Sequence, residues 1–264
     1  MLGSLFASAT GMKAQQRYVD NISNNLANVN TTGFKRSRID FQDLIYNTIV
    51  APGSESVQGY VVPSGLQIGT GVREVSTTKI FAQGRPDATG RELDLAIQGE
   101  GFFQVTHPSL NETVYTRDGS FRLNSSGQLV TVDGYVVTPQ ITIPSGTIQV
   151  TVGNDGTVWA VPGSDPNSRT NVGQISLATF ANAAGLSSLG HNLYAETPAS
   201  GSPTTGTAGS DGMGEIMQGQ LEGSNVDVVT ELVNLIIAQR AYEINSRAIS
   251  VSDKMLEQAN NVTR

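Results

Sequence analysis

The chain has 264 residues, a formal net charge of −7, only 15% charged residues and no cysteine. The length allows more than one domain with a sizeable core, and the acidic balance argues against nucleic-acid binding, which needs a basic excess. Without cysteine, disulfides, thiolate metal sites and a cysteine nucleophile are excluded. We expect neither a cleaved signal peptide nor direct membrane insertion, because no basic residue precedes Lys13 and no apolar stretch reaches transmembrane length.

The first 33 residues predict an amphipathic helix. Its apolar positions recur at spacings that combine three and four residues, which places them on one face: Leu5, Met12, Val19, Ile22, Leu26 and Val29. An asparagine-rich face lies opposite, and it is either a plain polar surface or a face that hydrogen-bonds with neighbours. We expect the helix to stop at residues 30–33, with Gly33 in the left-handed conformation, Asn28 capping or bridging the end, and Phe34 as an apolar anchor.

Residues 34–71 predict a connecting segment. It opens with a short basic cluster, which we interpret as a solvated corner or a donor of salt bridges between subunits: Lys35, Arg36 and Arg38. Phe41, Leu44 and Ile45 follow helical spacing, so residues 40–50 predict a second short helix. Residues 51–71, which include Tyr60, mix Gly, Pro, Ser and Gln and predict an extended, hairpin-like excursion.

Residues 72–224 predict a β-rich body, either a sandwich or a barrel, because turn signals fall about every ten residues. Two hairpins are expected, one around Asp133-Gly134 and one around residues 154–156. Residues 197–212 are rich in Ser, Thr, Gly and Pro and predict a mobile surface loop or linker.

The sequence offers little chemistry. His107 and His191 fall in different parts of the β region, beside a proline and a glycine, and are expected to be surface residues rather than metal ligands. The Gly-x-Gly pairs at 69–71 and 99–101 lack the further glycine or lysine of a phosphate-binding loop. No serine-elbow or zinc-helix motif is present, so no enzyme, cofactor or metal site is predicted.

The last 40 residues predict a second helix. A heptad of larger side chains runs along it, with Leu232, Ala238 and Ala259 between: Val228, Leu235, Tyr242, Ile249 and Leu256. Two such faces can bury each other as a coiled coil. The expected fold is therefore α+β, with a helical base of residues 1–33 plus 225–264, the connecting segment 34–71 and the outer β domain 72–224.

Five separated motifs resemble those of the bacterial flagellar rod and hook proteins. They lie at residues 24–35, 94–103, 115–121, 220–227 and 239–246, so the resemblance runs from end to end. Within that family, residues 63–73 and the excursion before them resemble the distal rod members.

The resemblance implies a structural subunit that polymerises into a rigid, hollow helical drive shaft, transmits torque to the hook and forms part of the export channel. Implied partners are further copies of the chain, proximal rod proteins, the hook protein, the periplasmic and outer-membrane ring proteins, and the flagellar type III export apparatus. The implied location is the basal body across the periplasm, reached without a cleaved signal peptide. We assign assembly roles to Leu5, Met12, Val19, Ile22, Leu26, Asn28, Val29, Gly33, Phe34, Lys35, Tyr60, Asn225, Leu235, Arg240, Tyr242, Ile249 and Leu256.

Alternatives remain at this level. A sibling axial protein, either proximal rod or hook, would share the motifs. A secreted β-rich adhesin or carbohydrate-binding module would need an exposed aromatic platform, for which Trp159 is the sole tryptophan. The assembly residues could also pack only within one subunit.

Overall fold

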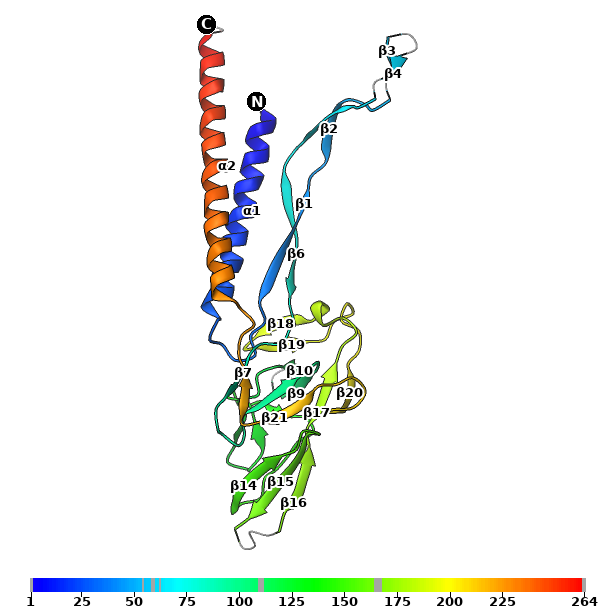
Figure 1. The fold of residues 1–264 in the computed structure, drawn as a ribbon, viewed down its shortest axis with the longest axis vertical. Helices are drawn as coiled ribbons and strands as arrows, with labels where there is room; N and C mark the ends of the chain where they lie inside the picture. The colour runs from blue at the N-terminus through cyan, green and yellow to red at the C-terminus, as the bar shows by residue number, and fades with distance from the viewer. Residues whose placement is uncertain are drawn as a thin grey trace. The chain divides into compact units, whose positions relative to one another are not determined.

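A computed structural model describes residues 2–53, 55–57, 60–61, 63–108, 112–163 and 168–262 (Figure 1). The chain forms two compact units. Unit 1 comprises residues 1–27, 37–78 and 227–264, and unit 2 comprises residues 28–36 and 79–226. Unit 1 contains two long helices and unit 2 is rich in strands, so the predicted α+β class is confirmed. Within the described residues, no helix is both long and apolar enough to span a membrane.

The helices of unit 1 are α1 (Leu2–Ala27) and α2 (Val228–Val262), and they pack antiparallel (Figure 1). Asn25 near the end of α1 contacts Glu231 near the start of α2, while Ser4 contacts Ser252 at the opposite ends. Asp227 caps α2, since its carboxylate accepts hydrogen bonds from the Val229 N–H and the Thr230 hydroxyl.

Helix α1 ends at Ala27, earlier than the sequence predicted, and Gly33 is not its cap. Gly33 does have a left-handed φ of +67°. Its conformation serves a close approach instead, because its N–H donates to the Glu222 carbonyl and an added Cβ would lie 2.7 Å from the Asp118 nitrogen.

The connecting segment of unit 1 is a strand ribbon (Figure 1). β1 (Ser37–Asp43) pairs with β6 (Val72–Lys79), β2 (Tyr46–Val50) with β5 (Leu66–Gly69), and β3 (Glu55–Val57) with β4 (Tyr60–Val61). The predicted short helix at residues 40–50 is therefore wrong. Pairing with distant strands satisfies the backbone of this segment, and the Phe41 ring packs edge-on against Tyr18 of α1 at 6.1 Å. The Tyr60 side chain lies outside the described residues.

Unit 2 is built from antiparallel strands. Its largest sheet has nine strands: β9 (Phe102–His107), β10 (Glu112–Thr116), β11 (Arg122–Leu123), β12 (Leu129–Val130), β13 (Val136–Val137), β17 (Ser176–Thr179), β18 (Ser187–Gly190), β19 (Leu193–Ala195) and β20 (Thr204–Thr207). A second sheet joins β14 (Thr147–Val152), β15 (Thr157–Pro162) and β16 (Thr170–Gln174). Two further pairs link β8 (Leu95–Gln98) with β21 (Glu215–Gln218) and β7 (Pro86–Ala88) with β22 (Gln220–Glu222). A short 3₁₀ turn, η1 (Ala183–Gly185), precedes β18.

The buried apolar side chains of unit 2 form two clusters. The larger cluster takes its most buried large side chains from five strands or their flanks: Phe103, Phe121, Ile97, Ile175, Leu177 and Ile216. The smaller contains Phe102, Tyr115, Ala178, Leu186 and Tyr194. Both predicted hairpins are confirmed as β12–β13 and β14–β15. The first has a three-residue turn, because the Thr131 N–H donates to the Tyr135 carbonyl around Val132-Asp133-Gly134.

The expected mobile loop at residues 197–212 is wrong in part. Strand β20 pairs with β17 across four residues, and Ser200 is buried with its hydroxyl bonded to the Thr197 carbonyl. Small polar side chains give this segment the composition of a linker, but cross-strand pairing orders its backbone.

Candidate assembly interface

Helix α2 carries a band of exposed apolar side chains. They recur at helical spacing on the side away from the fully buried Ala238, and we call them the outer face of α2: Val229, Val233, Ile236, Ile237, Ile244, Val251 and Met255. Ile244 is 65% exposed and Val229 is 70% exposed. Exposed apolar side chains that recur along one side of a helix, here interspersed with Arg240, Arg247 and Lys254, mark a surface that a partner covers.

The predicted heptad lies on the opposite side of α2. Leu235, Ile249 and Leu256 are half-buried on the side of the helix that carries Ala238 and Ser252, and Ser252 contacts α1. Tyr242 is 44% exposed and lines a groove of about 420 Å³ with Gln16, Val19, Gln239 and Glu243. Arg240 is exposed and pairs with Glu243 at 3.0 Å.

The predicted residues of α1 and the turn after it are more enclosed than those of α2. Ile22 is buried, while the others are half-buried: Leu5, Met12, Val19, Leu26 and Val29. Asn28 accepts a hydrogen bond from the Thr31 hydroxyl, which ties the turn that follows the helix. The sequence pattern therefore located the buried side of each helix and missed the outer face of α2.

Asn25 is a buried polar residue that the sequence analysis did not single out. Its side-chain amide donates to the Ser37 carbonyl and accepts from the Ser37 N–H, both at 2.9 Å, and it also donates to Glu231 at 3.4 Å. These bonds join α1, β1 and α2 within unit 1. Its place three residues after Ile22, on the buried side of α1, was the available signal.

Lys35 is buried within the chain. Its ammonium donates to Glu222 at 2.6 Å and to the Ala82 carbonyl at 2.9 Å, and Arg117 reaches the other Glu222 oxygen at 3.3 Å. We call these three side chains the ion triad. The expectation that Lys35 is a solvated corner or an intersubunit donor is wrong, because an acidic partner 187 positions away in the sequence neutralises it.

Burial dominates the electrostatics of the ion triad. Desolvation lowers the pKa of Lys35 although Glu222 favours its charged form, and desolvation likewise lowers the pKa of Arg117. Nearby, burial raises the pKa of the Tyr194 phenol to about 12. Two cations share one carboxylate here, so Glu222 is the member on which the others depend.

Asn225 joins three segments of unit 2. Its side chain accepts from the Arg36 N–H at 2.7 Å and donates to the carbonyls of Ile80 and Ala82. It bridges backbone segments and is not the cap of α2, a role that Asp227 takes. Phe34 is buried beneath the Lys79 ammonium, which lies 4.5 Å from the ring centre.

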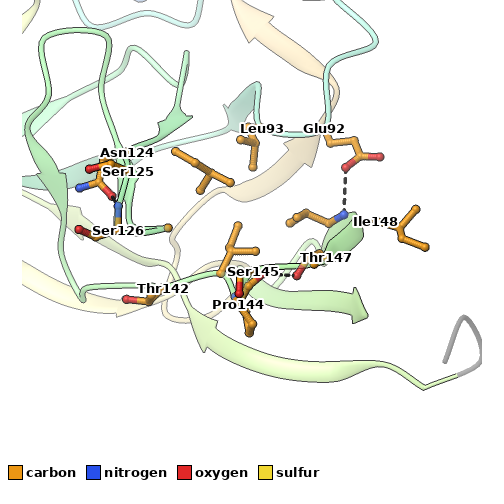
Figure 2. Close-up of a pocket in the computed structure, with 15 residues that line it drawn as sticks. Glu92, Leu93, Asn124, Ser125, Ser126, Thr142, Pro144, Ser145, Thr147 and Ile148 are labelled. Carbon is orange, nitrogen blue, oxygen red and sulfur yellow. Dashed lines mark hydrogen bonds between the residues drawn. The ribbon is translucent and has the colours of Figure 1, made fainter. Parts of the chain in front are cut away.

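One cavity in unit 2 offers a single carboxylate and no catalytic pair. It measures about 600 Å³, and its lining combines small polar residues (Ser, Thr and Asn) with apolar ones such as Leu93 and Ile148 (Figure 2). Its one carboxylate, Glu92, accepts from the Val150 N–H at 2.9 Å, a bond that supports the edge of β14 (Figure 2). His107 stacks on Tyr135, and the described residues contain no cluster of three potential metal ligands.

Three stretches of the chain match known protein families. Residues 5–35 match the model "Flagella basal body rod protein", residues 96–160 match "Flagellar hook protein FlgE/F/G D1 domain", and residues 217–262 match "Flagellar basal body rod FlgEFG protein C-terminal". The chain is 52% identical over 257 residues to the flagellar basal-body rod protein FlgG of Buchnera aphidicola subsp. Schizaphis graminum, covering 97% of this chain and 98% of the relative. It belongs to the FlgG family of flagellar basal-body rod proteins.

Two more relatives support the assignment. The FlgG of Caulobacter vibrioides is 49% identical over 96% of this chain and 97% of its own length, and that of Borreliella burgdorferi is 46% identical over all of both chains. As a member of this family, the chain is a structural subunit of the flagellar distal rod and is not an enzyme. Trp159 is half-buried in β15, so it offers no exposed platform for the adhesin alternative.

Proposed function

We propose that this subunit polymerises with further copies of itself through its two terminal helices, which pair as a coiled coil in the assembled rod. Residues 1–33 and 225–264 form the assembly base, residues 34–71 brace adjacent subunits, and residues 72–224 form a sandwich-like outer domain. The outer face of α2 is the single observation that carries the proposal. A long helix that leaves seven large apolar side chains exposed along one side requires a partner to cover them.

The energetics favour assembly over an isolated helix pair. Full burial of one Val, Ile or Met side chain contributes about 1.5–3 kcal/mol, so covering several of them by neighbours adds several kcal/mol in favour of the ordered helix pair. Without that burial, a helix of this kind is marginal in water. The termini are thus ordered by polymerisation. The exposed apolar side chains of the ribbon strands β2 and β5 are likewise buried by neighbouring subunits.

Mechanical function follows from many such contacts in parallel. The polymer is a straight, hollow drive shaft that carries torque from the motor through the periplasm to the hook and continues the export channel. Its partners are proximal rod proteins, the hook protein, the ring proteins of the periplasm and outer membrane, and the type III export apparatus. The low charge of the chain suits rotation inside the rings without firm binding.

The experiment compares one charge at two exposed positions of α2, one apolar and one polar. Ile244→Asp places a carboxylate in the middle of the outer face, and Ser250→Asp places one on an exposed polar position of the same helix. Both side chains are exposed in the subunit, so neither change disturbs the fold. Expressed in a strain that lacks the native gene, Ile244→Asp should abolish swimming and rod formation, whereas Ser250→Asp should retain both. Normal swimming of the Ile244→Asp strain would overturn the interface.

A further inference from the structure

The contact between α1 and α2 contains polar and small residues at matched heptad positions. On α2, the buried or half-buried positions Glu231, Ala238, Asn245 and Ser252 follow one another every seven residues. On α1, Asn25 contacts Glu231, Gly11 lies against Asn245, and Ser4 contacts Ser252. Each step along one helix is matched by an equal step in the opposite direction along the other. We call these pairs the rungs.

The rungs are complementary in size as well as in polarity. A Cβ added to Gly11 would lie 3.0 Å from the Asn245 amide nitrogen, so the glycine provides the space that the amide occupies. The two serine hydroxyls lie 3.3 Å apart and hydrogen-bond with each other. Asn25 donates to Glu231, whose side chain is only 4% exposed.

We infer that the rungs fix the register of α1 on α2. A heptad repeat alone permits sliding by seven residues, because apolar positions then meet apolar positions again. Sliding that moves Ser4 to Ala259 would place Asn25 opposite Ala238 and Asn245 opposite Tyr18. Asn25 would then keep its bonds to Ser37 but lose its acceptor on α2, and Asn245 would meet a bulky ring in place of a glycine. Polar residues inside a helix contact specify register at the expense of stability.

This inference does not rest on the proposed assembly, because it concerns one chain only. Its importance for the rod would be geometric, since the register decides which outer-face residues lie at which height along the subunit. A helix pair free to slide would present a different surface to each neighbour.

The absence of native cysteine allows a direct test in the full-length chain. The pair Ser4→Cys/Ser252→Cys reports the observed register, and Ser4→Cys/Ala259→Cys reports the register shifted by one heptad. Both pairs leave the other two rungs intact. Equilibration with reduced and oxidised glutathione at low protein concentration gives the effective concentration of each thiol pair, and non-reducing electrophoresis verifies that the disulfide is intramolecular. We expect the effective concentration of the Ser4→Cys/Ser252→Cys pair to exceed that of the Ser4→Cys/Ala259→Cys pair more than tenfold.

Rung variants then identify the cause. Glu231→Leu combined with Asn245→Leu should bring the ratio of the two effective concentrations close to one. The control, Glu257→Leu combined with Gln258→Leu at exposed positions, should leave that ratio unchanged. Glu231→Gln keeps an acceptor for Asn25 and should also preserve the ratio. Equal effective concentrations in the chain with intact rungs would overturn the inference, as would an undiminished ratio in the Glu231→Leu/Asn245→Leu chain. The first comparison can still overturn the inference where the leucine variant folds poorly.

Discussion

Glu222 offers the sharpest test of the interior of unit 2. Its carboxylate accepts hydrogen bonds from Lys35 at 2.6 Å, from the Gly84 N–H at 2.8 Å and from Arg117 at 3.3 Å. Glu222→Gln preserves the shape and one acceptor oxygen but removes the only negative charge of the ion triad. Lys35 and Arg117 then remain as buried cations without a counter-charge. Removing one partner of a buried ion pair costs about 3–5 kcal/mol, and we expect a loss of that size here.

Lys35→Met is the matched comparison, because it should cost far less. Arg117 and Glu222 remain as a neutralised pair, and the Ala82 carbonyl still accepts from Asn225. Burial already disfavours the Lys35 charge, as its lowered pKa shows, so an apolar chain of similar length is tolerated. The lost hydrogen bonds from the ammonium correspond to about 1 kcal/mol. We therefore expect Glu222→Gln to lower the free energy of unfolding by at least about 2 kcal/mol more than Lys35→Met does.

Urea unfolding measures both losses, with the sole tryptophan, Trp159 in β15, as a probe inside the same unit. Linear extrapolation gives the free energy of unfolding in water, which is typically about 5–15 kcal/mol for a domain. Equal losses for the two variants, or a larger loss for Lys35→Met, would refute the reasoning that one carboxylate neutralises both cations.

Two further predictions use the same unfolding assay. Gly33→Ala should lower the free energy of unfolding by more than about 2 kcal/mol, because a left-handed φ adds strain and the new Cβ meets the Asp118 backbone. Gly90 has a similar φ of +69° but open space around it, so Gly90→Ala should lower the free energy of unfolding only by the strain of about 1–2 kcal/mol. Equal losses at the two glycines would show that the close approach is unimportant. Burial raises the pKa of the Tyr194 phenol to about 12 in the folded chain. Below pH 10 the phenol is therefore protonated in the folded and in the unfolded chain, and its contribution to the free energy of unfolding is complete. Above pH 10 the unfolded chain releases this proton first, and stability falls, by about 1.4 kcal/mol at pH 11. Tyr194→Phe should lack that part of the decline between pH 9 and pH 11, and an identical decline in both chains would contradict the assignment.

Local chemistry made part of this fold predictable. The Asp133-Gly134 and 154–156 turns produce hairpins because a few adjacent residues decide the turn and its flanking strands. The long helix α2 was predicted for the same reason, since its periodicity persists over 35 residues. Motifs near both ends and within the body led to the family, which the comparisons establish.

Long-range pairing explains the failures. Residues 40–50 satisfy helical spacing, yet β2 pairs with β5 across about twenty intervening positions, and no local rule could choose between the two. Lys35 resembled a surface cation because its sequence neighbours Arg36 and Arg38 are basic. Its partner Glu222 is in contact with it in the fold but lies 187 positions away in the sequence. Both errors come from interactions between residues far apart in sequence.

Helix α2 shows why the same limit applies to its two faces. A heptad pattern locates one apolar side, and α2 has two, with the exposed cations Arg240, Arg247 and Lys254 lying among the apolar residues of the outer face. The side toward α1 contains small and polar residues at its most buried positions, so it buries little apolar area and contributes specificity more than stability. The outer face holds the larger exposed side chains, such as Ile244 and Val229. In a subunit arranged this way, the apolar area that could stabilise α2 remains available until another surface covers it, and folding of the helix pair becomes linked to association.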